Sequence, residues 1–369
     1  MRVTLGDVCE KGASNIKQSD IANMTGEYPI YGAAGYIGNV DFYHQEKPYV
    51  AIVKDGAGIG RTTLHPAKSS VIGTMQYLLP KDNVLPEYLC YVVRHMHLEK
   101  YFTGATIPHI YFRDYKNEQF NLDSLDKQAE IVEILGKAES IILKRRKELA
   151  ELDNLIKARF VEMFGIYPAN QMGWETGKIR DTVADVRYGS SRPAVDGGKY
   201  PYLRMNNITY GGELDLSDVK RIDVPENELD KCTVRRGDVL FNRTNSKELV
   251  GKTCVYDRDE MMVLAGFVIR VRVNDRVLPE FLSAFLNTDF SKKTLSEMCK
   301  AAIGQANINA QEMQNIGLYL PPLELQRQFV QFKKQVDKSK VVESIHRMNV
   351  LFNITLNGGN RYDIRANEF

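Results

Sequence analysis

The sequence predicts an α+β fold in which two β-rich domains are each followed by a long helix. The first observation behind this prediction is a duplication: the Leu-Pro-Glu triplet at residues 85–87 recurs at 278–280, an offset of 193 (278 minus 85). Further on, Gln128 matches Gln326 at an offset of 198 (326 minus 128). The second observation is that each glycine-rich, β-like stretch gives way to helical apolar spacing. A repeat this long indicates two whole domains rather than a solenoid.

Composition is that of an ordinary globular protein. The chain has 369 residues, of which 43% are hydrophobic and 26% charged, and a formal net charge of +2. This length has room for two cores. No apolar run is long enough to span a bilayer and the N-terminal residues lack a signal-peptide core, so we expect a cytoplasmic protein. The five cysteines, without a Cys-x-x-Cys pair, predict buried thiols rather than disulfides or a zinc site.

Residues 1–124 predict the first β-rich domain. Short β-branched or aromatic runs, such as residues 49–53 and 75–79, alternate with glycines, which is typical of strands joined by turns. One helix is predicted inside this domain over residues 85–101, because apolar residues at helical spacing follow a Pro-Glu start.

Residues 125–165 predict the first long helix. Apolar residues recur every seven positions, and arginines interrupt the seam at two places. The apolar positions are Leu135, Ile142, Leu149, Ile156 and Met163, and the interruptions are Arg145 and Arg159. At a rise of 1.5 Å per residue such a helix would span roughly 55 Å, or about 16 base pairs of DNA, so we expect a rod-like spacer. Gly165 and Pro168 are expected to end it.

Residues 166–320 repeat the plan of the first domain, with strands predicted at 239–241 and 267–271 and a helix from Leu278. A second long helix is predicted over residues 321–356, after two prolines that suit the approach to a helix. Its apolar spacing fades after Phe352, so we expect it to be shorter than the first. Residues 357–369 are predicted to be a C-terminal tail.

No stretch of the sequence predicts a reaction. Residues 56–63 resemble a phosphate-binding glycine loop, but three residues rather than four separate Gly56 from Gly60, and Arg61 replaces the lysine of a Walker A loop. A glycine turn is the plainer interpretation, and a loop whose backbone amides approach DNA phosphate is a third. His95 and His97 are two apart on the predicted helix, which disfavours a metal pair.

Polar side chains that can read bases recur at breaks beside the predicted strands. Arginine can bind guanine with two hydrogen bonds, and asparagine can do so with adenine. In the second domain we expect DNA contacts at Tyr188, Ser190, Arg192, Arg204, Asn206, Asn207, Arg243, Asn245, Ser246, Lys252, Gln305 and Asn307. In the first domain we expect them at Tyr36, Lys54, Arg61, Thr62 and His109, the last in a loop where it could contact a ligand.

Four motifs, taken in their order along the chain, resemble the specificity subunit of a type I restriction-modification enzyme. They are Tyr-Gly-Ala-Ala-Gly-Tyr-Ile-Gly at 31–38, Ile-Pro-His-Ile-Tyr-Phe-Arg-Asp at 107–114, the end of the first long helix at 152–165, and Leu-Pro-Pro-Leu-Glu-Leu-Gln at 320–326. The resemblance covers essentially the whole chain. It implies that the two β-rich modules are target recognition domains in a pseudo-twofold repeat, each reading half of a split DNA site. It also implies that the long helices are spacers packed antiparallel.

The resemblance implies partners as well. Modification subunits would methylate adenine with S-adenosylmethionine, and restriction subunits would act as motor-nucleases that use ATP and Mg²⁺. This chain would be non-catalytic and would bind no cofactor or metal itself. The two modules differ in length, because Asp7 matches Asp181 at an offset of 174 (181 minus 7) that later grows to 193. We therefore expect two different half-sequences and a bipartite, non-palindromic target.

Two other interpretations stay open at this point. A coiled-coil interaction scaffold without sequence-specific DNA binding would also explain the heptad seam, but it would not lose affinity steeply with salt as a DNA reader does. A nucleotide-dependent enzyme using residues 56–63 would lose nucleotide binding on the substitution Arg61→Ala.

Overall fold

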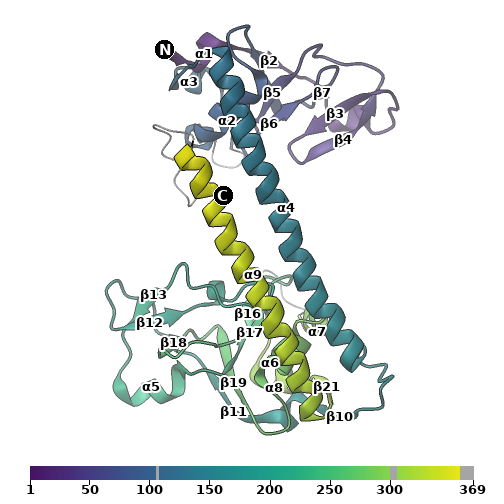
Figure 1. Cartoon of the computed structure of the whole chain (residues 1–369), viewed down its shortest axis with the longest axis vertical. Helices are drawn as coiled ribbons and strands as arrows, with labels where there is room; N and C mark the ends of the chain where they lie inside the picture. The colour runs from purple at the N-terminus through teal and green to yellow at the C-terminus, as the bar shows by residue number, and fades with distance from the viewer. Residues whose placement is uncertain (105–107, 300–305, 358–369) are drawn as a thin grey trace. The chain divides into compact units, whose positions relative to one another are not determined.

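The computed structural model of the protein describes residues 1–104, 108–299 and 306–357, with side chains described as far as Lys340 (Figure 1). The contacts of the chain divide it into unit 1, with Met1–Ile142, and unit 2, with Leu143–Phe352. Both units contain helices and sheets, which confirms the predicted α+β class. All five cysteines are buried and free. Within the described ranges, no helix is both long and apolar enough to cross a membrane.

Unit 1 is built on two larger sheets, a two-stranded ribbon that pairs β1 (Arg2–Thr4) with β9 (Gln119–Asn121), and a packed helix. The larger sheet has the strand order β2 (Cys9–Ala13), β8 (Met75–Pro80), β5 (Tyr49–Val53), β6 (Thr62–His65). The smaller has the order β4 (Gly35–Val40), β3 (Tyr28–Gly32), β7 (Ser70–Val71). Helix α2 (Pro86–His95) buries Leu89 and Val93 in one apolar cluster with Ile52 of β5. The remaining short elements are α1 (Leu5–Val8), η1 (Gln18–Ile21), η2 (Leu98–Tyr101) and α3 (Phe112–Tyr115).

The helix predicted over residues 85–101 is two separate elements, so that prediction was wrong at its C-terminal end. Helix α2 ends at His95, and the single turn η2 follows after a break. His97 stands in the break with a left-handed φ of 50°, a conformation that ends an α-helix. The apolar spacing continues across the break because Leu98 is buried in the same cluster, and this misled the sequence interpretation.

Unit 2 repeats this plan with longer connections. One sheet has the order β11 (Val183–Tyr188), β19 (Val268–Val273), β15 (Val239–Asn242), β17 (Thr253–Val255). The other has the order β13 (Lys220–Ile222), β12 (Tyr200–Leu203), β18 (Met262–Leu264), β14 (Thr233–Val234). Two ribbons pair β10 (Glu175–Lys178) with β21 (Gly317–Leu320), and β16 (Thr244–Asn245) with β20 (Ala306–Asn307). The shorter helical elements are η3 (Ile179–Thr182), η4 (Met205–Asn207), α5 (Glu226–Cys232), α6 (Pro279–Leu286), α7 (Asp289–Met298) and α8 (Ala310–Gln314).

Strand registers in the two units correspond. Arg2 pairs with Asn121 in unit 1, and Thr176 pairs with Tyr319 in unit 2, at offsets of 174 (176 minus 2) and 198 (319 minus 121). These are two of the offsets that relate the two halves of the sequence. The backbone of each unit therefore follows one pairing scheme.

One residue is added to that scheme inside a strand. The pairing of β2 with β8 has no irregularity, whereas β11 shifts register against β19 between Val183 and Asp185. Ala184 is the additional residue, and it forms a β-bulge. A bulge accommodates one extra residue while the strand beyond it stays paired.

Two long helices, α4 (Leu125–Phe164) and α9 (Leu323–Asn357), follow the two β-rich regions. Helix α9 continues five residues beyond Phe352, where the sequence pattern fades (357 minus 352). Within unit 2 the two helices are neighbours (Figure 1). Phe160 and Phe329 meet edge to face with ring centroids 5.2 Å apart, and Lys340 of α9 pairs with Asp153 of α4. The predicted tail lies outside the described residues from 358 onward.

Candidate nucleic-acid interface

A tyrosine and an arginine lie together where two strands of unit 2 end. Tyr188 is the last residue of β11, and Arg243 follows β15 directly. The Arg243 guanidinium lies 5.0 Å from the centroid of the Tyr188 ring, and the Tyr188 hydroxyl accepts a hydrogen bond of 2.9 Å from the backbone N–H of Ala310. Stacking of this kind orients the planar guanidinium. The buried Nε of Arg243 makes no hydrogen bond among the described residues. The pair is thus a pre-oriented donor group.

The ribbon of β16 and β20 brings two asparagines beside this arginine. Thr244 pairs with Asn307, and its hydroxyl donates to Asn307 Oδ1 at 3.0 Å. Asn245 donates through Nδ2 to Oδ1 of the fully buried Asn242 at 2.9 Å. Because Asn307 uses only Oδ1 in this contact, its Nδ2 keeps two donors. Ser246 follows as the next residue of the chain, half-buried.

A second group of predicted residues forms the turn after β12. Asn207 is only 2% exposed and donates to the carbonyl oxygens of Asp215 and Asp218, so it builds the turn. Arg204 is held by Asp218 at 2.7 Å, while Asn206 is exposed. A buried amide with satisfied partners is a structural group. The turn therefore presents Asn206 rather than Asn207.

Three further predictions in unit 2 have different outcomes. Ser190 is 8% exposed and lies against Ala265 in a parallel bridge. Arg192 places both nitrogens of its fork on Glu228, at 3.2 and 2.8 Å, and this contact lowers the pKa of Glu228. Gln305 lies outside the described residues. Of these, the structure offers neither Ser190 nor Arg192 as a free reader.

In unit 1 two residues predicted to contact DNA, His109 and Lys54, both lie beside Asp55. His109 Nδ1 lies 2.7 Å from Asp55 Oδ1, and the two residues also form a β-bridge. Next to them the backbone N–H of Ile110 donates to the carbonyl of Lys54 at 2.9 Å, and Lys54 Nζ lies 3.8 Å from Asp55. The loop histidine is therefore anchored, with its ring half-exposed.

Of the other predicted residues of unit 1, Arg61 and Tyr36 lie at the β3–β4 turn, and Thr62 does not. Arg61 donates through Nη1 to the carbonyl of Ala33 at 2.9 Å, and Tyr36 is 63% exposed on β4. Thr62 is 5% exposed and its hydroxyl donates to Gly60 O at 3.0 Å, so it is structural.

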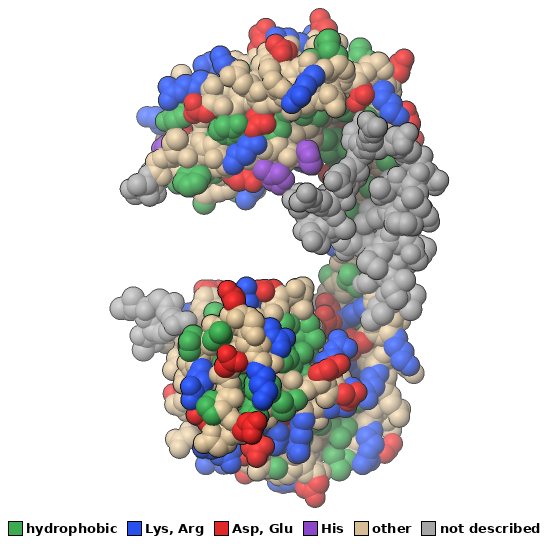
Figure 2. Space-filling view, turned by 90° about the vertical axis from the view of Figure 1, so that its left-hand side faces the viewer, with side chains coloured by type: hydrophobic (Ala, Val, Ile, Leu, Met, Phe, Trp, Pro, Cys, Tyr) green, Lys and Arg blue, Asp and Glu red, His purple; other side chains and the backbone are tan. Residues whose placement is uncertain are grey.

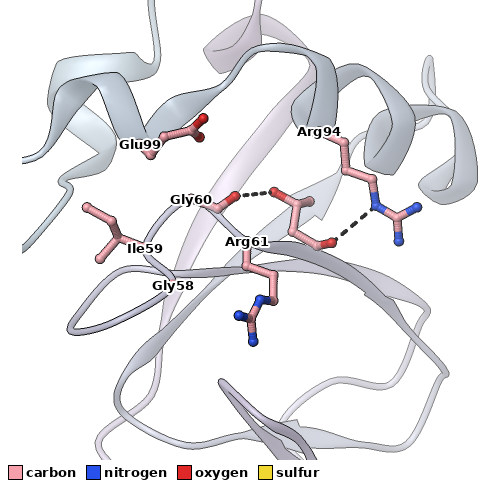
Figure 3. Close-up of a pocket in the computed structure, with 7 residues that line it drawn as sticks. Gly58, Ile59, Gly60, Arg61, Arg94 and Glu99 are labelled. Carbon is pink, nitrogen blue, oxygen red and sulfur yellow. Dashed lines mark hydrogen bonds between the residues drawn. The ribbon is translucent and has the colours of Figure 1, made fainter. Parts of the chain in front are cut away.

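The glycine-rich segment is a turn between strands. Gly56, Gly58 and Gly60 have φ values of 85°, 91° and 82°, which residues other than glycine rarely adopt. The strand β6 follows immediately, so the loop does not lead into an α-helix as a phosphate-binding loop does. The turn borders a pocket of about 410 Å³ between it and α2. Figure 3 shows Arg94 reaching from α2 to the carbonyl of Thr62, at 3.2 Å, while Arg61 extends away from it.

Each unit has a cationic side chain at the same position of the strand arrangement that the two units share. Arg61 in unit 1 donates to Ala33 O at 2.9 Å, and Lys252 in unit 2 donates to Met205 O at 2.8 Å. Ala33 lies two residues after Tyr31, where β3 pairs in parallel with β7, and Met205 lies two residues after Leu203, where β12 pairs in parallel with β18. Lys252 is 7% exposed. The sequence predicts both residues as DNA contacts, and the structure shows that each donates to the carbonyl of a turn.

Phe267 is an exposed residue beside Arg243 that the sequence did not indicate as part of the candidate interface. It is 52% exposed, and its carbonyl accepts the backbone N–H of Arg243 at 3.0 Å. It went unnoticed because it opens an apolar run that reads as buried strand.

Charge on the visible surface is mixed. On the face that Figure 2 shows, lysine and arginine side chains are interspersed with aspartate and glutamate in both units. Within residues 1–104, 108–299 and 306–340, no three His, Cys, Asp or Glu side chains are grouped to hold a metal ion. Individual cations, rather than one uniform field, therefore distinguish this surface.

Comparison with known families gives a match over most of the chain. A sequence model described as "Type I restriction modification DNA specificity domain" matches residues 1–154 and 172–349. The Type I restriction enzyme MjaVIII specificity subunit of Methanocaldococcus jannaschii is 25% identical over 341 residues, which cover 84% of this chain and 78% of that protein. The Type I restriction enzyme EcoKI specificity subunit of Escherichia coli is 25% identical over 199 residues.

Coverage of the relatives varies. The match to the EcoKI subunit covers 53% of this chain and 42% of that protein. The match to the putative MjaX specificity subunit of M. jannaschii, 26% identical, covers 44% of this chain and 39% of that protein. Among solved structures, a type I restriction-modification S subunit from M. genitalium aligns over 96% of this chain and 95% of its own, with a TM-score of 0.54 and 14% identity. At that identity the likeness concerns the fold.

Proposed function

The chain belongs to the family of type I restriction-modification DNA specificity domains, and from that premise we propose that it is the DNA-specificity subunit of a type I restriction-modification enzyme. The observation that carries the proposal is that the family match occurs twice, over residues 1–154 and 172–349. Each matched segment contains one β-rich region and much of the long helix after it. In this role the chain selects the site and performs no catalysis.

The two β-rich regions act as a pseudo-repeat of target recognition domains. The equal registers of Arg2 with Asn121 and of Thr176 with Tyr319 support a common origin of the two frames. Their reading groups differ, however. Unit 1 has Lys54 where unit 2 has Arg243, and His109 where unit 2 has Asn307. Each unit therefore reads a different half-sequence, and the target is bipartite and non-palindromic.

Within unit 2, base reading falls to the side chains that the fold leaves with free donors. Arg243, oriented by Tyr188, suits the acceptor edge of guanine, and the amides of Asn245 and Asn307 suit adenine. Asn206 adds a second point of contact at the turn after β12. In unit 1 the corresponding group is Tyr36, Lys54, Arg61 and His109.

The long helices are spacers that set the distance between the half-sites. In unit 2 their contacts have the order expected of antiparallel neighbours, because Phe329 of α9 meets Phe160 of α4 and the later residue Lys340 meets the earlier Asp153. A heptad seam of this kind is stabilised by packing along its length. Changing the number of helical turns would change the number of base pairs between the half-sites.

The proposal includes partners in the cytoplasm. Modification subunits methylate adenine in the selected site with S-adenosylmethionine, and restriction subunits supply an ATP- and Mg²⁺-dependent motor-nuclease. These cofactors belong to the partners rather than to this chain. The comparisons give the alternative of a DNA-independent coiled-coil scaffold no support.

Methylation-site sequencing tests the proposal directly. DNA is sequenced from cells that express the chain together with a modification subunit, and from cells that lack only this chain. We expect adenine methylation at one split, asymmetric motif, present only when the chain is present. An identical methylation pattern in both samples would overturn the proposal, and a short continuous motif would overturn its bipartite part.

A further inference from the structure

One corner of unit 2 gathers three lysines without an acidic partner. Lys157 is exposed on α4, Lys292 is half-buried on α7, and Lys252 is 7% exposed just before β17. In the part of the chain that the structure describes, no aspartate or glutamate forms an ion pair with any of them. Most other cations of this unit do have such a partner, as Arg192 has in Glu228.

Two contacts fix the position of the Lys292 ammonium group. Its Nζ donates to the carbonyl of Gly251 at 2.9 Å and lies 5.4 Å from the centroid of the Tyr210 ring. Lys252, which follows Gly251 in the chain, donates from its own Nζ to Met205 O at 2.8 Å. Carbonyl oxygens and aromatic rings orient an ammonium group through dipoles and quadrupoles, but they do not neutralise its charge.

The loop that carries Tyr210 also contacts α9, which is paired with α4 at this point. Glu213, three residues further on, lies 3.0 Å from Lys340 Nζ, and the same ammonium group pairs with Asp153 of α4. Lys157 follows Asp153 by four residues, so it lies on the same face of α4 one turn further along. The loop therefore contacts Lys292 of α7 directly, and Lys340 of α9 links it to the part of α4 that carries Lys157.

The charges of these lysines act on one another. Burial, and then the positive charges of Lys157 and Lys252, lower the pKa of Lys292 to about 8. Like charges held together in this way are unfavourable unless an anion joins them. The carboxylates of Asp153 and Glu213, on the two segments just described, are paired with Lys340. The corner is thus built to receive a negative charge from outside the chain.

Unit 1 carries the opposite charge beside the corresponding glycine. Gly60 and Gly251 each lie two residues before a strand, β6 and β17, and have φ values of 82° and 79°. Glu99 lines the pocket beside Gly60 (Figure 3), whereas Lys292 donates to the carbonyl of Gly251. The cationic group beside this glycine is therefore found in unit 2 and not in unit 1.

Resting on the DNA-binding function proposed above, we propose that Lys157 and Lys292 together hold a phosphate group of the DNA backbone, with Lys252 adding its charge beside them. Such a contact fixes the position of the duplex on unit 2 and carries no sequence information of its own. It acts alongside the reading group at Arg243. Arg243 and Lys252 lie at opposite ends of the segment that connects β15 to β17.

The test measures how the affinity of the full chain for DNA depends on salt. The probe is a duplex of about 30 base pairs of arbitrary sequence, because a backbone contact forms on any sequence. Titrations at several salt concentrations compare the wild-type chain with Lys157→Gln, Lys292→Gln and the double variant. Lys293→Gln is the matched control, since this lysine is exposed on the same helix. The fluorescence of the single tryptophan, Trp174, reports whether unit 2 is folded in each variant.

We expect the slope of log affinity against log salt to become shallower by about 0.9 if one phosphate contact is lost, while the methylated motif stays the same. The Lys293→Gln control keeps the wild-type slope. A wild-type slope in both Lys157→Gln and Lys292→Gln overturns the inference, as does an equal change in the control. A motif altered at one base would make the site a base contact and also overturn it. If Lys292→Gln fails to fold, the exposed Lys157 alone decides. A wild-type chain that binds no duplex would refute the proposed function itself, which is a distinguishable result.

Discussion

Gln128 and Gln326 make the same hydrogen bonds in the two units. Each is fully buried near the start of its long helix. The Oε1 of Gln128 accepts the backbone N–H of Leu85 at 2.9 Å, and Gln326 does the same with Leu278 at 2.8 Å. Each Nε2 donates to two carbonyl oxygens, one just before the Leu-Pro-Glu helix and one just before the long helix. One side chain thus ties the base of each long helix to its β-rich region.

Replacing Gln326 with leucine should destabilise unit 2 by about 3 kcal/mol. The substitution leaves one N–H and two carbonyls buried without a partner, and each such group costs about 1–3 kcal/mol before relaxation. Trp174 lies in unit 2 and donates from its indole to Phe164 O at 3.1 Å, so its fluorescence follows the unfolding of that unit in urea. Gln331→Leu, at an exposed position of the same helix, is the control and should leave the transition in place.

The matching substitution Gln128→Leu should leave the Trp174 transition unchanged and lower the stability of unit 1 only. Far-ultraviolet circular dichroism would then show a second, earlier transition. A shift of the tryptophan transition in Gln128→Leu would mean that the two units unfold as one.

Replacing Arg243 with alanine should cost about 1–3 kcal/mol of DNA affinity and relax one base position of the methylated motif. Tyr188→Ala should have a smaller effect of the same kind, because the guanidinium then loses the ring that orients it. Arg187→Ala is the control, because Arg187 is exposed on the same strand as Tyr188. The decisive reading is the motif: a loss of affinity that is equal on all sequences would make Arg243 a phosphate contact.

Acid should destabilise unit 1 through His65. The residue is 5% exposed, stacks on Tyr49, and burial lowers its pKa to about 4. The unfolded chain binds a proton near pH 6.5, so the folded state has its full stability above that pH and loses it as the pH falls toward 4. The loss is at most about 3 kcal/mol, from 1.36 kcal/mol per pKa unit. Urea unfolding at pH 7 and pH 5 should show a smaller difference in His65→Phe, and an equal difference would contradict this account.

DNA affinity should weaken between pH 7 and pH 9 if Lys292 binds phosphate. Its pKa of about 8 means that the free chain loses this charge in that interval, whereas bound phosphate favours the charged form. The neighbours that bear on it are Lys157, Lys252 and the ring of Tyr210. Lys292→Met should show a flatter pH dependence of affinity for the same duplex, and equal dependence in both proteins would exclude Lys292 as the titrating group.

The sequence predicts well those features that depend on neighbours in the chain. The glycine turn before Thr62 and the long helix over Leu125–Phe164 follow from local pattern, and the structure has both. The outcome for polar site residues depends instead on distant partners. Asn207 is turned inward by the carbonyl of Asp218, and Arg192 is occupied by a glutamate 36 residues away. No spacing rule reveals such pairs.

The bulge at Ala184 bears on how this protein can diverge. An extra residue in a regular strand would turn every later side chain to the other face of the sheet. Because the bulge absorbs the residue, β11 still delivers Tyr188 to the end of the sheet beside Arg243. Insertions can therefore accumulate in one half of the gene without forcing compensating changes in the core. New binding preferences can evolve on one half while the other half, and the framework beneath both, stays as it was.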